Sequence, residues 1–177
     1  MMTKTRTLLA GLSGLAAVSC AAPDGAGPGE DEMTAVPAPV ARTAQGAFLG
    51  AVMEDGSVRF KGIPYAAAPV GELRFRPPQP APVPDGIVDA TAETQPACAQ
   101  ADLGWNGDDR ANMSEDCLVL AIRTPALAPE APLPVMVFIH GGANLGGRGE
   151  WAVEGDLHQQ GVVVASLQYR LRALGFM

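Results

Sequence analysis

The segment His140-Gly141-Gly142-Ala143 has the residue types best suited to catalysis in this chain. It ends an apolar run, Val135–His140, and its glycines let the backbone turn sharply, leaving amide groups unpaired and directed at a ligand. Amides fixed in this way stabilise an oxyanion during acyl transfer, each by about 2.7–4 kcal/mol. The alternative is a glycine-rich strand exit that only turns the chain.

Other ligands fit this loop and the composition poorly. Gly142–Gly149 has the glycine spacing of G-x-x-x-x-G-K-[ST], but Arg148 and Gly149 replace the lysine and the hydroxyl residue. A net charge of −7 argues against nucleic acid as a partner. The cysteines and histidines lack metal-ligand spacing, so we expect neither a metal nor a cofactor.

A catalytic serine is missing from the sequence. The nucleophile elbow G-x-S-x-G holds its serine on a strained strand-to-helix turn. None of the serines has these neighbours: Ser13, Ser19, Ser57, Ser114 and Ser166. Of the two histidines, we expect His140 to hydrogen-bond the glycine loop rather than act as a base, and His158 to face solvent.

Three apolar runs predict the strands that would position the glycine loop: Leu118–Arg123, Val135–His140 and Val162–Tyr169. The last two lack clear alternation, which predicts burial on both faces. Between them, Trp151–Gln160 predicts a short helix that Gly161 ends. This order of strand, glycine loop, helix and strand indicates an α/β fold.

The chain before these strands predicts a hairpin and an irregular segment. Ala47–Glu54 and Ser57–Lys61 are joined by Asp55-Gly56, which tolerates the positive φ of a tight turn. Pro64–Pro84 is rich in proline, and we expect it to lie over a scaffold without regular structure.

The N-terminus has the pattern of an export signal over residues 1–20. Lys4 and Arg6 precede an apolar run from Leu8 to Val18 that is too short to span a bilayer, and small residues follow. The four residues ending at Cys20 resemble the bacterial lipobox, which implies lipidation of this cysteine; ordinary cleavage after a small residue is the alternative.

The predicted signal is followed by a segment of Ala, Pro, Gly and acidic residues, residues 21–42, which predicts a disordered tether. Together they predict an exported protein of the bacterial cell envelope, held at a membrane by a lipid anchor or secreted.

From about Gly46 to Met177 the chain resembles the type-B carboxylesterase/lipase family of the α/β-hydrolases. The matching segments are FKGIPYA at 60–66 with PVGELRF at 69–75, SEDCL at 114–118, VFIHGGA at 137–143, and YRL at 169–171 with LGF at 174–176. Because these segments occur in the family's order, the resemblance implies its fold and a carboxylic ester as substrate.

The resemblance also implies roles for single residues. The amides of Gly142 and Ala143 would be oxyanion donors, and Gly141 would shape the turn. Cys98 and Cys117 would close a disulfide loop, worth about 3 kcal/mol in the chain-entropy model.

Within and beneath that loop, two further features are implied. Arg74 and Glu115 occupy the positions of a family ion pair, and pairing would let both charges be buried. Trp105 lies inside the loop, and we expect it to be a packing or exposed residue.

These observations predict an incomplete α/β-hydrolase fold over residues 43–177: an N-terminal β-hairpin and the first strands of a mixed sheet. The chain would contribute the oxyanion hole to a serine carboxylesterase, while the serine, acid and histidine of the triad would lie beyond Met177. Alone it would be inactive and poorly stable, with an open sheet edge. A non-catalytic, membrane-anchored remnant or binding module is the alternative.

Overall fold

The computed structural model describes residues 38–177. The predicted signal peptide, Cys20 and most of the predicted tether lie outside this range. The described part begins with strand β1 (Val40–Thr43), so the predicted tether boundary at residue 42 is too late by three residues. Within residues 38–177, no helix has the length and apolar character needed to cross a membrane.

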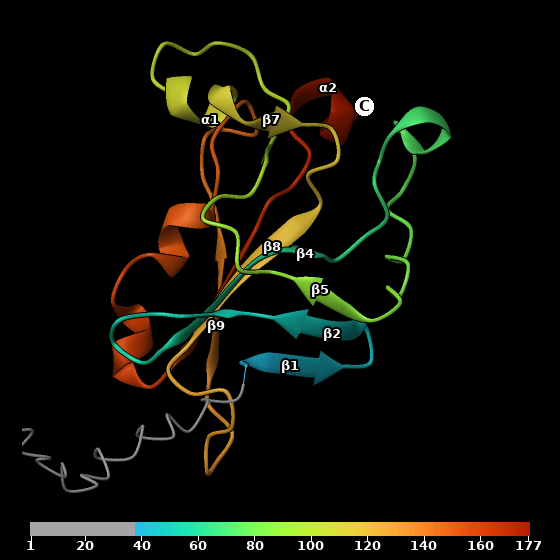
Figure 1. Cartoon of the computed structure of the whole chain (residues 1–177). Helices are drawn as coiled ribbons and strands as arrows, with labels where there is room; N and C mark the ends of the chain where they lie inside the picture. The colour runs from blue at the N-terminus through green and yellow to red at the C-terminus, as the bar shows by residue number, and fades with distance from the viewer. Residues whose placement is uncertain (1–37) are drawn as a thin grey trace, which may run out of the picture. The chain divides into compact units, whose positions relative to one another are not determined.

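The main sheet has five strands in the order β3-β4-β8-β10-β9, and only β9 and β10 pair in parallel (Figure 1). Its strands are β3 (Ala51–Val52), β4 (Val58–Pro64), β8 (Val119–Thr124), β9 (Val135–Ile139) and β10 (Val163–Leu167). A parallel pair needs a long crossover, and here it holds the glycine loop and two short helices.

Smaller elements complete the described part. A three-stranded sheet contains β1, β2 (Gly46–Leu49) and β5 (Ile87–Asp89), and β6 (Ala97–Cys98) pairs with β7 (Met113–Ser114). The α-helices are α1 (Gly107–Ala111) and α2 (Arg172–Phe176). The 3-10 helices are η1 (Gly71–Leu73), η2 (Glu150–Val153) and η3 (Leu157–Gln160).

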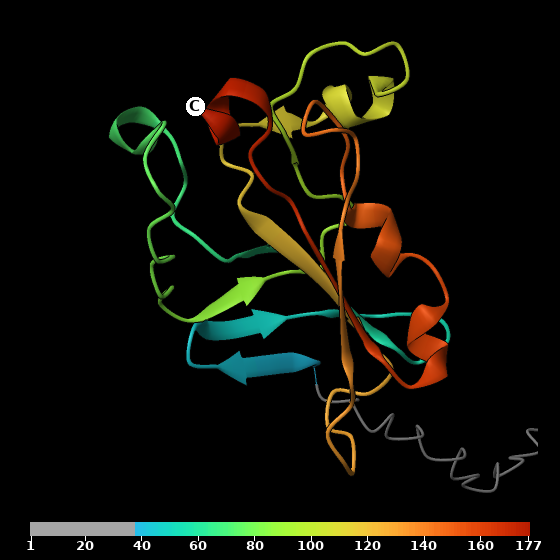
Figure 2. The same ribbon diagram turned by 180° about the vertical axis from the view of Figure 1, so that it is seen from behind.

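The crossover packs on the sheet through η2. Ala152 and Val153 of η2 are buried with Ala121 of β8 and Val164 of β10. Figure 2 shows η2 and η3 beside the sheet from behind. The predicted helix over Trp151–Gln160 is therefore two separate 3-10 turns, and the predicted stop at Gly161 is present, because this residue has a φ of 74°.

Strand β9 departs from its predicted burial on both faces. Four of its five residues are exposed, Val137 by 57% and Ile139 by 65%. The reason is what covers its faces: strand side chains point to the two faces of the sheet, and in the described part only Phe138 of β9 packs against a buried cluster, that of Ala152 and Val153. Strand β10, which lies between β8 and β9, buries Val164 and Ser166.

The predicted hairpin is present in part. Gly56 has a φ of 80° in the turn between β3 and β4, as the Asp-Gly pair predicts. The ladder is shorter than expected because Gly46–Leu49 pairs instead with β1 and β5.

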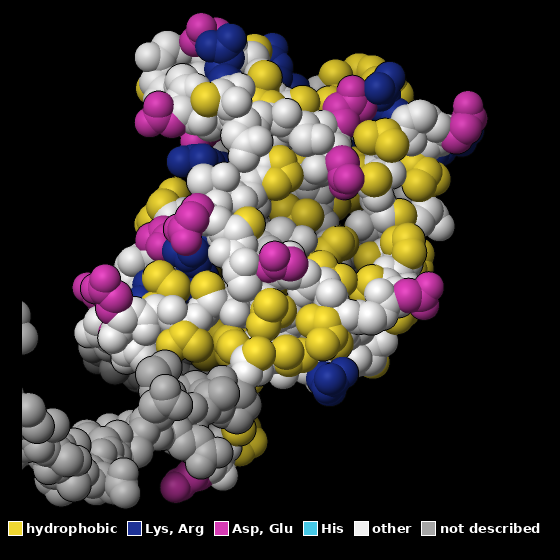
Figure 3. All heavy atoms as spheres, viewed as in Figure 1, with side chains coloured by type: hydrophobic (Ala, Val, Ile, Leu, Met, Phe, Trp, Pro, Cys, Tyr) yellow, Lys and Arg dark blue, Asp and Glu magenta, His cyan; other side chains and the backbone are white. Residues whose placement is uncertain are grey.

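An apolar groove of about 530 Å³ lies where β1 and β2 meet β4 and β8, and its walls include Phe48, Phe60, Leu120 and Ile122. Hydrophobic side chains gather over the middle of the face shown in Figure 3, with charged side chains mostly around them.

Candidate functional site

The glycine loop leaves the end of β9 in an unusual backbone conformation. Gly142, Ala143 and Asn144 have consecutive positive φ values of 117°, 54° and 58°. A Cβ atom on Gly142 would lie 1.8 Å from the carbonyl oxygen of Gly146, so only glycine fits there. Gly141 has no positive φ and has open space at its Cβ position, so the turn expected at Gly141 is made by Gly142.

The amide groups of the loop differ in their bonding. The carbonyl of Gly142 accepts hydrogen bonds from the amides of Leu145 and Gly146, at 2.9 and 3.3 Å. Within residues 38–177, the amides of Gly142 and Ala143 donate to no acceptor. Two neighbouring donors are therefore left available at the exposed start of the loop.

A hollow of about 230 Å³ lies in front of this loop. Its walls are formed by Trp105, Asp109, His140, Gly141, Gly142, Gly147, Arg148 and Trp151. Both tryptophan side chains are about 60% exposed. Arg148 is paired with Asp109 at 3.0 Å, so the charged part of the wall is neutralised. The hollow thus combines aromatic surface with the free amide of Gly142, while Ala143, the next residue, does not line it.

His140 is hydrogen-bonded to the start of the loop. It is 4% exposed, and its Nδ1 lies 2.9 Å from the carbonyl oxygen of Gly141. Because a carbonyl only accepts, Nδ1 carries the proton. Burial lowers the pKa of His140, which favours the neutral ring at neutral pH. In the described part no carboxylate hydrogen-bonds to this ring, so these residues supply no acid partner that would make His140 a catalytic base.

The disulfide loop reaches the same site. Cys98 and Cys117 form a disulfide and are both 1% exposed. Trp105, inside this loop, lies close to the glycine turn: a Cβ atom on Gly142 would be 3.6 Å from Trp105 Cη2. The tryptophan is exposed, as expected, and it lines the hollow.

Arg74 and Glu115 form the expected ion pair, with Nε–Oε2 and Nη2–Oε1 distances of 2.6 and 2.9 Å. The expectation that both charges are buried is wrong: the two side chains are 44% and 32% exposed. Because they lie at the surface, the pair has a small effect on stability.

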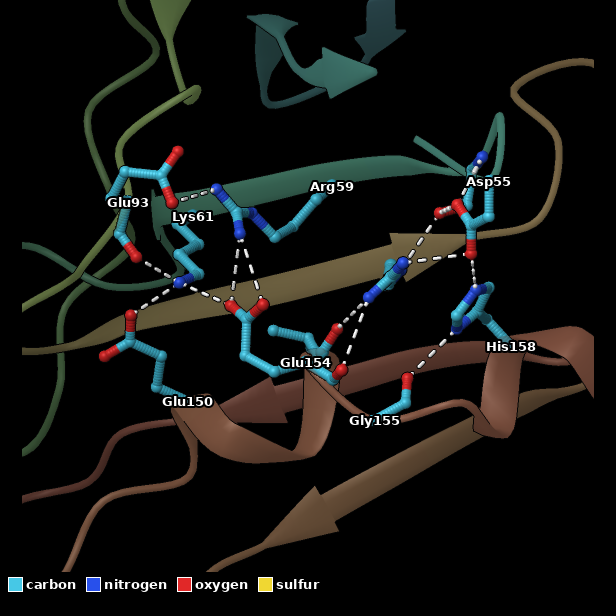
Figure 4. Close-up of polar contacts among 11 residues, drawn as sticks. Asp55, Arg59, Lys61, Glu93, Glu150, Glu154, Gly155 and His158 are labelled. Atoms are coloured by element: carbon cyan, nitrogen blue, oxygen red, sulfur yellow. Dashed lines mark hydrogen bonds and ion pairs between the residues drawn. The ribbon is translucent and has the colours of Figure 1, made fainter. Parts of the chain in front are cut away.

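A buried charge cluster was not predicted. Lys61 of β4 is 3% exposed and contacts Glu150 and Glu154 at 2.7 and 2.6 Å (Figure 4). Arg59, on the same face of β4, pairs with Glu93 and Glu154. The signal in the sequence was the spacing: the basic residues are two apart in a strand, and Glu150 and Glu154 are four apart.

His158 belongs to a second part of this cluster, and its predicted solvent exposure is wrong. It is 2% exposed, with Nε2 2.7 Å from Asp55 Oδ2 and Nδ1 3.1 Å from the Gly155 carbonyl (Figure 4). Asp55 also binds Ser57 and Arg123. Here the carboxylate, rather than the histidine, contacts the serine, so this is not the order of a catalytic triad.

The described serines lie away from the hollow. Ser57 is 2% exposed and bonded to Asp55, and Ser166 is fully buried in β10. Neither these nor Ser114 lines the hollow. Within residues 38–177, no three His, Cys, Asp or Glu side chains are grouped as metal ligands.

Comparison with known proteins gives consistent matches. The family model described as "Carboxylesterase family" matches residues 37–177. The chain is 43% identical over 155 residues to liver carboxylesterase of Sus scrofa, covering 78% of this chain and 27% of that protein. It is 42% identical over 128 residues to para-nitrobenzyl esterase of Bacillus subtilis, covering 70% and 26%. The chain therefore spans about a quarter of the length of these relatives.

Solved structures match in the same way. A thermophilic PNB esterase superposes with a TM-score of 0.68 at 40% identity, over 78% of this chain and 29% of that chain. A carboxylesterase of Geobacillus stearothermophilus gives a TM-score of 0.67 at 39% identity, over 78% and 27%.

Proposed function

The chain belongs to the carboxylesterase family, and on this premise we propose that its glycine loop supplies two oxyanion donors of a serine carboxylesterase. Its fold is the N-terminal part of the α/β-hydrolase fold, as the sequence predicts. The donors are the amides of Gly142 and Ala143. The nucleophile, the acid and the base come from sequence outside these 177 residues.

The proposal is supported most directly by the two neighbouring unpaired amides, of which that of Gly142 belongs to a residue lining the hollow. When an alkoxide attacks the acyl carbon of an ester, electrons of the carbonyl bond move to its oxygen, which becomes an oxyanion. Donors already fixed in place stabilise this charge without reorganising. Loss of one such donor lowers the rate about 10²–10³-fold.

His140 has a different part in this scheme. Its Nδ1 proton is bonded to the Gly141 carbonyl, at the point where the loop begins. A neutral, buried ring in this position fixes the start of the loop through this bond. We assign it a positioning role.

A hybrid enzyme tests the proposal. Residues 38–177 replace the matching segment of the Bacillus subtilis para-nitrobenzyl esterase, and hydrolysis of a para-nitrobenzyl ester is measured. Gly142→Ala places Cβ against the Gly146 carbonyl, so we expect kcat to fall about 100-fold. Gly155→Ala is the matched control, because its Cβ position is open, and it should behave as the parent hybrid.

Two results would overturn the proposal: a folded hybrid that hydrolyses no ester, or a folded Gly142→Ala variant with full activity. The first would favour a non-catalytic binding module. The 177-residue chain alone should hydrolyse no ester, and labelling of the purified chain by a serine-reactive phosphonate would contradict this expectation.

We also propose export, with lipidation at Cys20 and a tether, from residue 21 to the start of β1, that holds the following domain near a membrane. The support is the pattern of residues 1–20. The test is fractionation of cells: wild-type protein should sediment with membranes, and Cys20→Ala should be soluble. Equal distribution of the two would exclude the anchor.

A further inference from the structure

We propose that Gln100 is a positioning residue for the glycine loop, which fixes Gly147 and thereby keeps the amides of Gly142 and Ala143 available to substrate. The inference rests on the proposed function and adds a residue that touches no substrate.

The side chain of Gln100 binds both backbone groups of Gly147. Its Oε1 accepts from the Gly147 amide at 2.8 Å, and its Nε2 donates to the Gly147 carbonyl at 3.1 Å. Oε1 also accepts from Asn106 at 2.9 Å, and Nε2 donates to the Cys98 carbonyl at 3.1 Å. Gln100 is 8% exposed, and both donors and both acceptor sites of its amide are used.

Gly147 in turn packs directly on the start of the glycine loop. A Cβ atom on Gly147 would lie 2.7 Å from the Gly141 carbonyl oxygen and 2.8 Å from His140 Nδ1. In the same way, a Cβ atom on Gly142 would collide with the carbonyl oxygen of the neighbouring Gly146. Since there is no free space between these two stretches of backbone, a shift of Gly147 moves the loop that carries the donors.

Gln100 itself lies in a segment that is held in place. Cys98, two residues before Gln100, is held by the disulfide to Cys117. Asn106 is 1% exposed and bonds Gln100, the Ala101 carbonyl and the Leu103 amide. Figures 1 and 2 both show α1, which follows Asn106, beside the orange loop after β9. The disulfide loop therefore serves as the fixed support of the glycine loop.

A residue that only stabilises the fold would behave differently, and Gln95 provides the comparison. It is 1% exposed, and its Oε1 accepts from the Gly62 amide at 3.1 Å, a contact that does not involve the glycine loop. Loss of Gln95 should lower global stability without changing the loop.

Hydrogen exchange of the 177-residue chain measures directly how firmly Gln100 holds the glycine loop. In Gln100→Ala, the backbone amides of residues 141–149 should exchange about tenfold faster than in Gln95→Ala. The two variants are compared under conditions in which their free energies of unfolding are equal. Gln100→Glu keeps the shape and the acceptor but loses the donor, so it should also speed exchange. If Gln100→Ala does not fold, the Gln100→Glu variant provides the comparison. Exchange at the Gln95→Ala rate would overturn the proposal.

The hybrid enzyme then tests the link to catalysis. Gln100→Ala should lower kcat about 10–100-fold at unchanged KM, because donors misplaced by an ångström cost about that much. Gln95→Ala should keep kcat. Faster exchange with unchanged kcat would overturn the positioning role. If the parent hybrid is inactive, the proposed function fails, while the exchange comparison still decides whether Gln100 fixes the loop.

Discussion

The hydroxyl group of Tyr169 donates a 2.6 Å hydrogen bond to the carbonyl oxygen of His140, and its ring stacks on the imidazole with the centroids 4.3 Å apart. This contact joins the chain after β10 to the end of β9, where the glycine loop starts. Burial raises the pKa of Tyr169, so its hydroxyl stays protonated and remains a donor across the neutral range.

Removing this hydroxyl should affect stability and catalysis together. Tyr169→Phe leaves the His140 carbonyl without its donor and should lower the free energy of unfolding by about 1–2 kcal/mol. In the hybrid enzyme it should also lower kcat, because the loop loses its fixed origin. Tyr65→Phe is the matched control: it loses an equal 2.6 Å bond, to the Gln168 carbonyl. Tyr65→Phe should lower the free energy of unfolding by a similar amount and leave kcat unchanged. If both variants lowered kcat equally, Tyr169 would have no special role at the loop.

The buried charge of Lys61 gives a prediction about stability alone. Lys61→Met leaves the Glu150 carboxylate buried without its closest cation and should cost about 3–5 kcal/mol, measured by urea unfolding. Lys61→Met/Glu150→Met should recover part of the loss, since no buried charge remains at that contact. Arg110→Ala breaks the exposed Arg110–Asp102 pair and should cost less than about 1 kcal/mol. If Lys61→Met lowered the free energy of unfolding as little as Arg110→Ala does, the cluster would be solvated rather than buried.

Acid should act on the fold through Asp55. The Ser57 hydroxyl, followed by His158, holds the pKa of this carboxyl well below its usual range. Because the folded-state pKa is lower than the unfolded value of about 3.9, the carboxylate stabilises the fold above that pH and loses this effect as pH falls further. Asp55→Asn should therefore be less stable than wild type at pH 7, and the difference should shrink at about pH 2.

Urea midpoints at the two pH values check this. The exposed Asp85→Asn variant is the control and should follow wild type at both. A difference between Asp55→Asn and wild type that stays constant from neutral to acid would contradict the role of the carboxylate.

The edge strand β9 should make the 177-residue chain associate. Val137 is 57% exposed on a strand whose outer backbone groups have no neighbouring strand in the described part. Val137→Lys should reduce self-association measured by sedimentation, because a charge on an edge strand opposes pairing. Val83→Lys replaces an equally exposed valine in a loop and should change nothing. Association that is equal in all three proteins would exclude β9 as the contact.

The sequence predicted features that depend on local chemistry and missed those that depend on neighbours. Gly56 and Gly161 have the positive φ values that their turns require, and these were predicted from residue type alone. The predicted burial of β9 was wrong because its apolar residues indicate a buried strand, whereas the exposure of its side chains depends on what packs on the two faces of the sheet.

The oxyanion roles of Gly142 and Ala143 were implied by the resemblance and stay a proposal, whereas the positive φ that turns the loop lies at Gly142, one residue after Gly141. Gln100 had no signal of its own. Its role depends on a contact with Gly147, a partner 47 residues away, and a single glutamine in a polar segment indicates nothing about such a partner. His158 was missed for the same reason, since its partner Asp55 lies 103 residues away.

The most direct test of the central claim is a crystal structure of the active hybrid carrying a phosphonate adduct on its nucleophile. The account predicts that one phosphonyl oxygen lies about 2.7–3.1 Å from the amide nitrogens of both Gly142 and Ala143. An adduct whose oxygens point away from the loop, with both amides unbonded, would contradict it.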